Sequence, residues 1–183
     1  MLKLIGMAGI ITASGLIGIS KTRVLKERVT ILEDYMQMII ELKGHINYFK
    51  EPLPIIFERL RENNNSKAHM FLNSLSHELL ESDTQITTAW YNKLSEVYDN
   101  CPLSDEDFKT MKYPGEFIGQ TDFENHLYHF TYLEEKLKAQ IGDAKGCLKK
   151  KGPMYNKIGF FLGSIVAIIL SVSYTHLTLP TIA

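Results

Sequence analysis

Two histidines on a predicted helix are the side chains best suited to chemistry by their type and spacing. His126 and His129 lie three residues apart and therefore share one helical face, with Glu124 near them. Such a pair could bind zinc if a third ligand came from elsewhere in the chain. Leucine and aromatic residues surround the pair, however, and they favour a partly buried face on which both histidines pack or form hydrogen bonds. We therefore predict no metal site.

Other catalytic patterns are incomplete in this sequence. The pair His77-Glu78 lacks the second histidine of a metalloprotease helix. No glycine-rich phosphate loop follows a predicted strand, and no serine stands in the context of a hydrolase nucleophile. Cys101 and Cys147 lie far apart in the chain and fit two reduced thiols better than a disulfide. We predict no catalytic residue, no cofactor and no enzymatic activity.

The aromatic and acidic residues indicate protein packing and not nucleic-acid binding. The net charge is −1, so no overall basic field attracts a polyanion. Trp90 beside Tyr91 fits a core anchor and its rim better than a platform for stacking bases. Ser104 followed by Asp105-Glu106-Asp107 is the pattern of a helix start, with a hydroxyl cap and acids at the positive end of the dipole. The same acids could meet a basic partner surface, and both interpretations stay open.

The elements that position these residues lie between two apolar ends. Residues 4–19 carry no charge and span about 24 Å as a helix, at about 1.5 Å per residue. A signal peptide would also fit this stretch, but the basic residues directly after it favour an uncleaved anchor. We predict a transmembrane helix over residues 1–20. Small residues give it a surface for close helix packing: Gly6, Ala8, Gly9, Ser14, Gly15 and Gly18.

A second uncharged segment predicts a transmembrane helix over residues 158–172. Basic residues gather on the middle-facing flanks of both segments, whereas Lys3 alone lies on an outward flank. The positive-inside rule therefore predicts a cytoplasmic middle and both termini outside. Residues 173–183 look like a translated adapter sequence, so we expect a non-native tail there. The membrane-flanking basic residues are Lys21, Arg23, Lys26, Arg28, Lys149, Lys150, Lys151 and Lys157.

Residues 21–157 are predicted to form an all-α bundle of about five or six helices between the two transmembrane helices. No segment alternates apolar and polar residues for long enough to be a strand. The first helix of the bundle can continue the N-terminal anchor without a break. Apolar residues recur at steps of three and four over residues 24–49, 68–81, 84–98 and 122–148, which predicts a helix in each range. A proline marks the start of a short helix over residues 54–61.

Prolines predict where these helices are interrupted. Residues 51–54 contain two prolines and predict a corner between helices. Tyr113-Pro114-Gly115 predicts a break in the element that starts at Ser104, or its end. Gly152-Pro153 predicts a hinge between the last bundle helix and the second transmembrane helix.

Several short motifs occur in an order and spacing that are more specific together than each motif is alone. They are Met1-Leu2-Lys3-Leu4-Ile5-Gly6, Ile46-Asn47-Tyr48, Pro52-Leu53-Pro54, Ala89-Trp90, Gly119 with Asp122, and Tyr155 with Ile158-Gly159. Over about residues 1–170 the chain resembles the stage III sporulation protein AB family.

This resemblance implies a component of the channel apparatus between mother cell and forespore in endospore-forming bacteria. Family members are similar to the inner-membrane platform protein of type II secretion and type IV pilus systems. By that analogy the helical domain lies in the mother-cell cytoplasm, at the outer forespore membrane, and docks a cytoplasmic ATPase, stage III sporulation protein AA. Other channel components would be further partners, and the glycine-rich ends fit a homo-oligomer.

The candidate site residues are a structural or partner-facing corner. Tyr48, Pro52 and Pro54 either make a rigid corner between two helices or present a fixed loop to a partner domain. Gly119 and Asp122 join them through the resemblance alone.

A two-span membrane sensor with a helical ligand-binding domain is the alternative function. Sensors of this kind usually hold the domain between their spans outside the cell. The distribution of lysine and arginine predicts the opposite side here, which favours the platform over the sensor.

Overall fold

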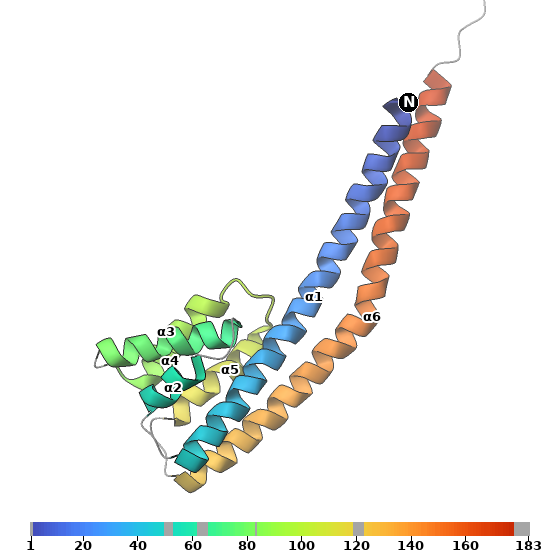
Figure 1. The fold of residues 1–183 in the computed structure, drawn as a ribbon. Helices are drawn as coiled ribbons and strands as arrows, with labels where there is room; N and C mark the ends of the chain where they lie inside the picture. Colours follow the sequence, from blue (N-terminus) through green and yellow to red (C-terminus); the bar gives the residue numbers. More distant parts are fainter. Residues whose placement is uncertain (1, 50–52, 62–65, 83, 119–122, 178–183) are drawn as a thin grey trace, which may run out of the picture. The chain divides into compact units, whose positions relative to one another are not determined.

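The computed structural model describes residues 2–49, 53–61, 66–82, 84–118 and 123–177. For residues 2–5, 47–49, 54, 61, 123–125 and 171–177 it describes the backbone alone. Within these ranges the chain forms six helices and no strand, which confirms the predicted all-α class. The helices are α1 (Leu2–Phe49), α2 (Leu53–Arg61), α3 (Lys67–Glu81), α4 (Ile86–Tyr98), α5 (Asp105–Phe117) and α6 (Phe123–Leu177) (Figure 1).

The chain divides into two compact units, and the long helices α1 and α6 contribute to both. The first unit consists of Met1–Lys26 and Lys145–Ala183, and the second consists of Glu27–Ala144. In the second unit, α2 packs on α3, α3 on α4 and α4 on α5. The predicted continuity between the N-terminal segment and the first bundle helix is confirmed, because α1 is one helix of 48 residues.

Trp90 of α4 lies at the centre of the core of the second unit. Its ring is fully buried and packs edge-on against Phe71 of α3, with the ring centroids 4.8 Å apart. The Trp90 Nε1 donates to the Met111 carbonyl oxygen of α5 at 3.0 Å. The Tyr35 hydroxyl of α1 donates to the same oxygen at 2.8 Å. One carbonyl therefore joins α1, α4 and α5, and the interpretation of Trp90 as a core anchor is confirmed.

Helix α5 does not end at Pro114, so the predicted interruption there is wrong. The proline lies only three residues before the helix end at Phe117, where its missing N–H removes a single helical hydrogen bond. Packing stabilises this last turn. A β-carbon added at Gly115 would lie 2.8 Å from Trp90 Cγ, and the Thr87 hydroxyl donates to the Gly115 carbonyl oxygen at 2.8 Å.

Helix α6 likewise continues through Pro153, so the predicted hinge at Gly152-Pro153 is also wrong. The helix runs for 55 residues, and the segment 158–172 is part of it and not a separate helix. Pro153 removes one helical hydrogen bond, the one to the Lys149 carbonyl oxygen. Thr22 of α1 contacts the neighbouring Gly152 carbonyl oxygen at 3.1 Å, so α1 packs against this turn.

Among the residues that the structure describes, one helix is long and apolar enough to cross a membrane. It is α6, over the range His126–Leu170, judged by length and composition. The described part of α1 does not meet the same criterion, and the side chains of its first residues lie outside the description. The predicted second span therefore has a counterpart in α6, whereas the N-terminal span over residues 1–20 stays a prediction.

Candidate functional site

The corner predicted from the prolines falls on parts of the chain that the structure leaves undescribed. Pro52, Gly119 and Asp122 lie outside the described residues. Tyr48 lies in α1 and Pro54 in α2, but neither side chain is described. The corner stays a prediction.

The first unit contains a seam of small residues along which α1 and α6 pack closely. A β-carbon added at Gly18 of α1 would lie 2.5 Å from the Tyr155 carbonyl oxygen of α6. One added at Gly159 of α6 would lie 2.7 Å from the Ser14 carbonyl oxygen, and one at Gly163 would lie 2.9 Å from Ser14 Cβ. No larger side chain fits at these positions without a shift of the backbone. The glycines therefore set the distance between the helices.

Hydroxyl groups complete this small-residue seam. The Ser14 hydroxyl donates to the Gly159 carbonyl oxygen. Thr22 Oγ1 lies 3.1 Å from the Gly152 carbonyl oxygen, 3.0 Å from Asn156 Oδ1 and 3.1 Å from the Gly18 carbonyl oxygen of its own helix. Its single proton serves one of these acceptors at a time. In a bilayer, apolar burial provides little driving force for helix association. Helix pairs there associate through small residues and through hydroxyl side chains that form hydrogen bonds across the helices.

The register of the seam brings the two basic clusters to one level of the helix pair. Contacts run from Thr22 with Gly152, through Gly18 with Tyr155, to Ser14 with Gly159, so the two helices are antiparallel. Lys21 and Arg23 flank Thr22, and Lys149 to Lys151 immediately precede Gly152. All seven predicted flanking residues in the first unit are exposed: Lys21, Arg23, Lys26, Lys149, Lys150, Lys151 and Lys157.

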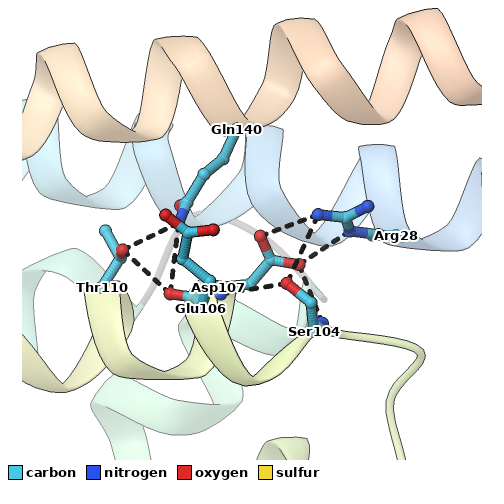
Figure 2. A network of polar contacts seen from close by, with 6 residues as sticks. All are labelled: Arg28, Ser104, Glu106, Asp107, Thr110 and Gln140. Carbon is cyan, nitrogen blue, oxygen red and sulfur yellow. Dashed lines mark hydrogen bonds and ion pairs between the residues drawn. The ribbon is translucent and has the colours of Figure 1, made fainter.

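The eighth predicted flanking residue, Arg28, belongs to the second unit and forms an ion pair there. Its Nε donates to Asp107 Oδ2 at 2.7 Å and its Nη2 donates to Asp107 Oδ1 at 3.0 Å, which makes a bidentate ion pair (Figure 2). The Asp107 side chain is fully buried, whereas 23% of the Arg28 side chain is exposed. Arg28 therefore ties α1 to the start of α5.

The same carboxylate closes the cap of α5. The Ser104 backbone N–H donates to Asp107 Oδ2 at 2.9 Å, and the Asp107 N–H donates to the Ser104 hydroxyl at 3.2 Å. This reciprocal pair is a capping box and confirms the predicted helix start. Burial raises the pKa of Asp107, but the hydrogen bonds from Arg28 and Ser104 outweigh it, so the pKa lies below its ordinary value. The carboxylate stays ionised.

Gln140 of α6 holds the other side of the first turn of α5. Its Nε2 donates to the Glu106 carbonyl oxygen at 3.1 Å and to Thr110 Oγ1 at 2.8 Å (Figure 2). Within the second unit, Arg28 of α1 and Gln140 of α6 thus both bind the first turn of α5. Asp105 and Glu106 remain exposed there, so only two of the three acids predicted as a patch face solvent.

The two histidines of α6 pack as the sequence predicts. The His129 ring stacks on Phe117 of α5 with centroids 4.9 Å apart, and its Nδ1 shares a hydrogen bond with the Tyr113 hydroxyl. His126 is buried against the edge of the same phenylalanine. Both rings therefore belong to an aromatic cluster between α5 and α6.

The comparisons with known proteins agree with one another. The family model described as stage III sporulation protein AB matches residues 3–171. The chain belongs to this family. A curated member, stage III sporulation protein AB of Bacillus subtilis (strain 168), is 24% identical over 170 residues, which cover 93% of this chain and 99% of the relative.

A solved structure of stage III sporulation protein AB resembles this chain in fold. It matches with a TM-score of 0.63 and 21% identity, over 67% of this chain and 97% of the solved chain. At that level of identity the likeness supports the fold of the family and says nothing of individual contacts.

The structure identifies site residues of this family member that the sequence interpretation missed. Gly159 and Gly163 form a G-x-x-x-G spacing in an apolar segment, which is a known signal for close helix packing. Of the small surface predicted on α1, Ser14 and Gly18 contact α6, whereas a β-carbon at Gly6, Gly9 or Gly15 would meet no atom within 4 Å. The Arg28–Asp107 pair had no local signal, because its partners are 79 positions apart.

Proposed function

We propose that this chain is a non-enzymatic membrane platform component of the mother cell–forespore channel that endospore formation requires. Membership of the stage III sporulation protein AB family supports the role in sporulation. In the proposal, the first unit anchors the chain in the membrane as a pair of helices. The second unit lies in the mother-cell cytoplasm and docks the ATPase stage III sporulation protein AA.

The observation that carries this proposal is the register of the small-residue seam. Thr22 meets Gly152 at the level of the basic clusters, and from that level onward Ser14 packs against Gly159 and Gly163 between uncharged segments. Large apolar side chains of α6 remain exposed beside the seam, and more than half of Phe161 and of Ile168 is accessible. An antiparallel pair that is charged at one level and apolar beyond it suits a membrane hairpin with its basic level in the cytoplasm.

The second unit is suited to dock a partner because its helices are held together by specific contacts. The Met111 carbonyl oxygen joins three helices, and the Arg28–Asp107 pair fixes the start of α5. The adjacent acids Asp105 and Glu106 are exposed and offer a charged edge to a basic partner surface. A surface on rigid helices presents such groups in a constant geometry.

A topology reporter tests the membrane arrangement. An enzyme that is active only in the cytoplasm is inserted next to Ser66 in the full chain, and an enzyme that is active only outside is inserted there in a matched fusion. We expect activity from the cytoplasmic reporter alone. Activity from the outside reporter would refute the platform and support the two-span sensor.

Co-purification tests the ATPase as a partner. The tagged full-length chain is extracted in mild detergent from sporulating cells, with an equally tagged, unrelated two-span membrane protein as the control. We expect the ATPase to be enriched with the chain and not with the control. Equal recovery in both, with the helical content of the chain intact, would overturn the docking proposal while leaving the role in sporulation.

A further inference from the structure

The face of α6 opposite the seam carries a shallow groove of about 540 Å³ in the first unit. At about 3.6 residues per turn, the groove residues fall roughly on the side of the helix opposite Gly152, Gly159 and Gly163, which face α1. The seam therefore leaves this face uncovered. The groove is lined chiefly by Lys150, Lys157, Ile158, Phe161, Leu162 and Ile165.

Charge and apolar surface are separated along this groove. Lys150 and Lys157 are seven residues apart, or about 10 Å along the axis, and share one helical face at the end nearest the second unit in sequence. Beyond Lys157 the lining is apolar: Ile158, Phe161, Leu162 and Ile165 follow helical steps of three and four. No carboxylate is among the described residues that line the groove.

We propose that this groove binds one anionic phospholipid. The phosphate lies between the ammonium groups of Lys150 and Lys157, and an acyl chain lies along Ile158, Phe161 and Ile165. The inference rests on the proposed membrane placement of the first unit. Basic pockets on the cytoplasmic side of membrane helices recognise anionic headgroups, and lysine stems can lie along apolar surface while the charge reaches the headgroup level.

The pattern favours a lipid over an acidic segment of a protein. An acidic helix carries charges along its length, and an acidic strand carries unpaired backbone groups as well. These charges or backbone groups would lie against apolar side chains at Phe161 and Ile165 without partners. A phospholipid is charged at one end only. Its charge and its apolar chain match the two ends of the groove in order.

Matched lysine pairs provide the main test. The full-length protein in detergent is titrated with phosphatidylglycerol or with phosphatidylcholine, and bound lipid is counted by native mass spectrometry. The groove variant carries both Lys150→Gln and Lys157→Gln. The control variant carries both Lys149→Gln and Lys151→Gln, which removes the same charge from exposed residues that do not line the groove. We expect the groove pair to lower phosphatidylglycerol affinity roughly tenfold or more and the control pair to lower it about twofold or less.

A matched phenylalanine pair tests the apolar end. Phe161 lines the groove, whereas its neighbour Phe160 is similarly exposed and does not line it. We expect Phe161→Ala to weaken phosphatidylglycerol binding and Phe160→Ala to leave it unchanged. Circular dichroism of each variant establishes that its helical content is retained, so that a loss of binding reflects the groove.

Three results would overturn the lipid site. Equal losses from the two lysine pairs would mean attraction to charge in general, and displacement of the lipid by millimolar inorganic phosphate would mean a site for phosphate alone. A bound species with the mass of a protein would mean a docked partner. The reporter next to Ser66 separates these failures from the proposed function, because a cytoplasmic signal with no lipid selectivity refutes the groove alone.

Discussion

Asp107 is a buried acid whose charge is maintained by what surrounds it. Its side chain is fully buried, yet Arg28 donates two hydrogen bonds to it and the Ser104 N–H donates a third. A buried ion pair of this kind contributes little net stability compared with an apolar pair, but removing one partner leaves the other charge uncompensated. Its value lies in fixing which residue of α1 meets the start of α5.

Asp107→Asn tests this contribution. Asparagine can still accept a hydrogen bond from the Ser104 N–H, so the change removes chiefly the ionic contact with Arg28. We expect a loss of about 2 to 4 kcal/mol in the free energy of unfolding, toward the low end because Arg28 is partly exposed. Urea titration followed by circular dichroism measures it. The control Asp105→Asn removes an exposed charge from the same turn, and a loss as large as that of Asp107→Asn would contradict the assignment.

The same pair predicts the direction of a pH dependence. The pKa of Asp107 in the folded chain lies below its ordinary value of 3.8, so its contribution to stability is fully present above that value. It is lost as the pH falls below 3.8 and through the lower pKa of the folded state. We expect the stability difference between the native chain and Asp107→Asn to be constant from pH 7 to about 5 and to shrink below about 4. A difference that grows on acidification would contradict the pairing.

Two glycines in helices of the second unit should respond in opposite directions to alanine. A β-carbon at Gly115 would lie 2.8 Å from Trp90 Cγ, whereas one at Gly142 would meet no atom within 4 Å. We expect Gly115→Ala to destabilise the chain by about 1 to 3 kcal/mol through overpacking. Gly142→Ala should stabilise it by about 0.5 to 1 kcal/mol, because alanine favours a helix interior. Urea titration of both variants under one condition measures these changes, and a Gly115→Ala chain as stable as the native chain or more stable would refute the close contact with Trp90.

At the scale of the elements, the seam between α1 and α6 depends on the absence of side chains. Gly159→Leu would bring its side chain against the Ser14 carbonyl oxygen, whereas Gly15→Leu points into open space on α1. We expect Gly159→Leu to lower the thermal midpoint in micelles by several degrees, in line with an overpacking cost of about 1 to 3 kcal/mol. Gly15→Leu should change it little. A large effect at Gly15 with none at Gly159 would show that a different face of α1 makes the contact.

The element boundaries show what a single sequence can and cannot reveal. Periodicity and Pro54 located α2, α3 and α4 to within about two residues, and the Ser104 cap located the start of α5, because these signals are local. Pro114 and Pro153 misled the interpretation, since each proline removes only one helical hydrogen bond and another helix packs against each turn. Trp90 packs against Gly115, and Thr22 reaches Gly152. These neighbours come from distant parts of the sequence, so no local pattern reveals them.

For the whole molecule, the proposed role predicts a developmental block. We expect deletion of the gene in its own spore-forming host to stop development after engulfment, and the native chain supplied in trans to restore spores. Counting heat-resistant spores measures it. The Gly159→Leu chain, expressed at the native level, should restore fewer spores than the Gly15→Leu chain. Normal sporulation without the gene would refute the role of this chain.

At this scale the sequence was enough to predict the family and the helical class, whereas the site depends on contacts between segments that are distant in the chain. Residues 3–171 match the family model, and short ordered motifs were enough to suggest it. The Arg28–Asp107 pair and the meeting of Thr22 with Gly152 arise only when distant segments come together. Arg28 shows the difference clearly, because its position after an apolar segment predicts a membrane flank but gives no sign of its ion pair with a buried acid in the bundle.

The fluorescence of Trp90 has a practical use. It is the only tryptophan in the chain, and it is fully buried within the second unit. Emission excited at the red edge of protein absorption therefore originates from the bundle alone, with no signal from the helices that we assign to the bilayer. A quencher that cannot enter the folded core would leave that emission intact until the bundle opens. The intact protein thus contains its own optical probe of one unit.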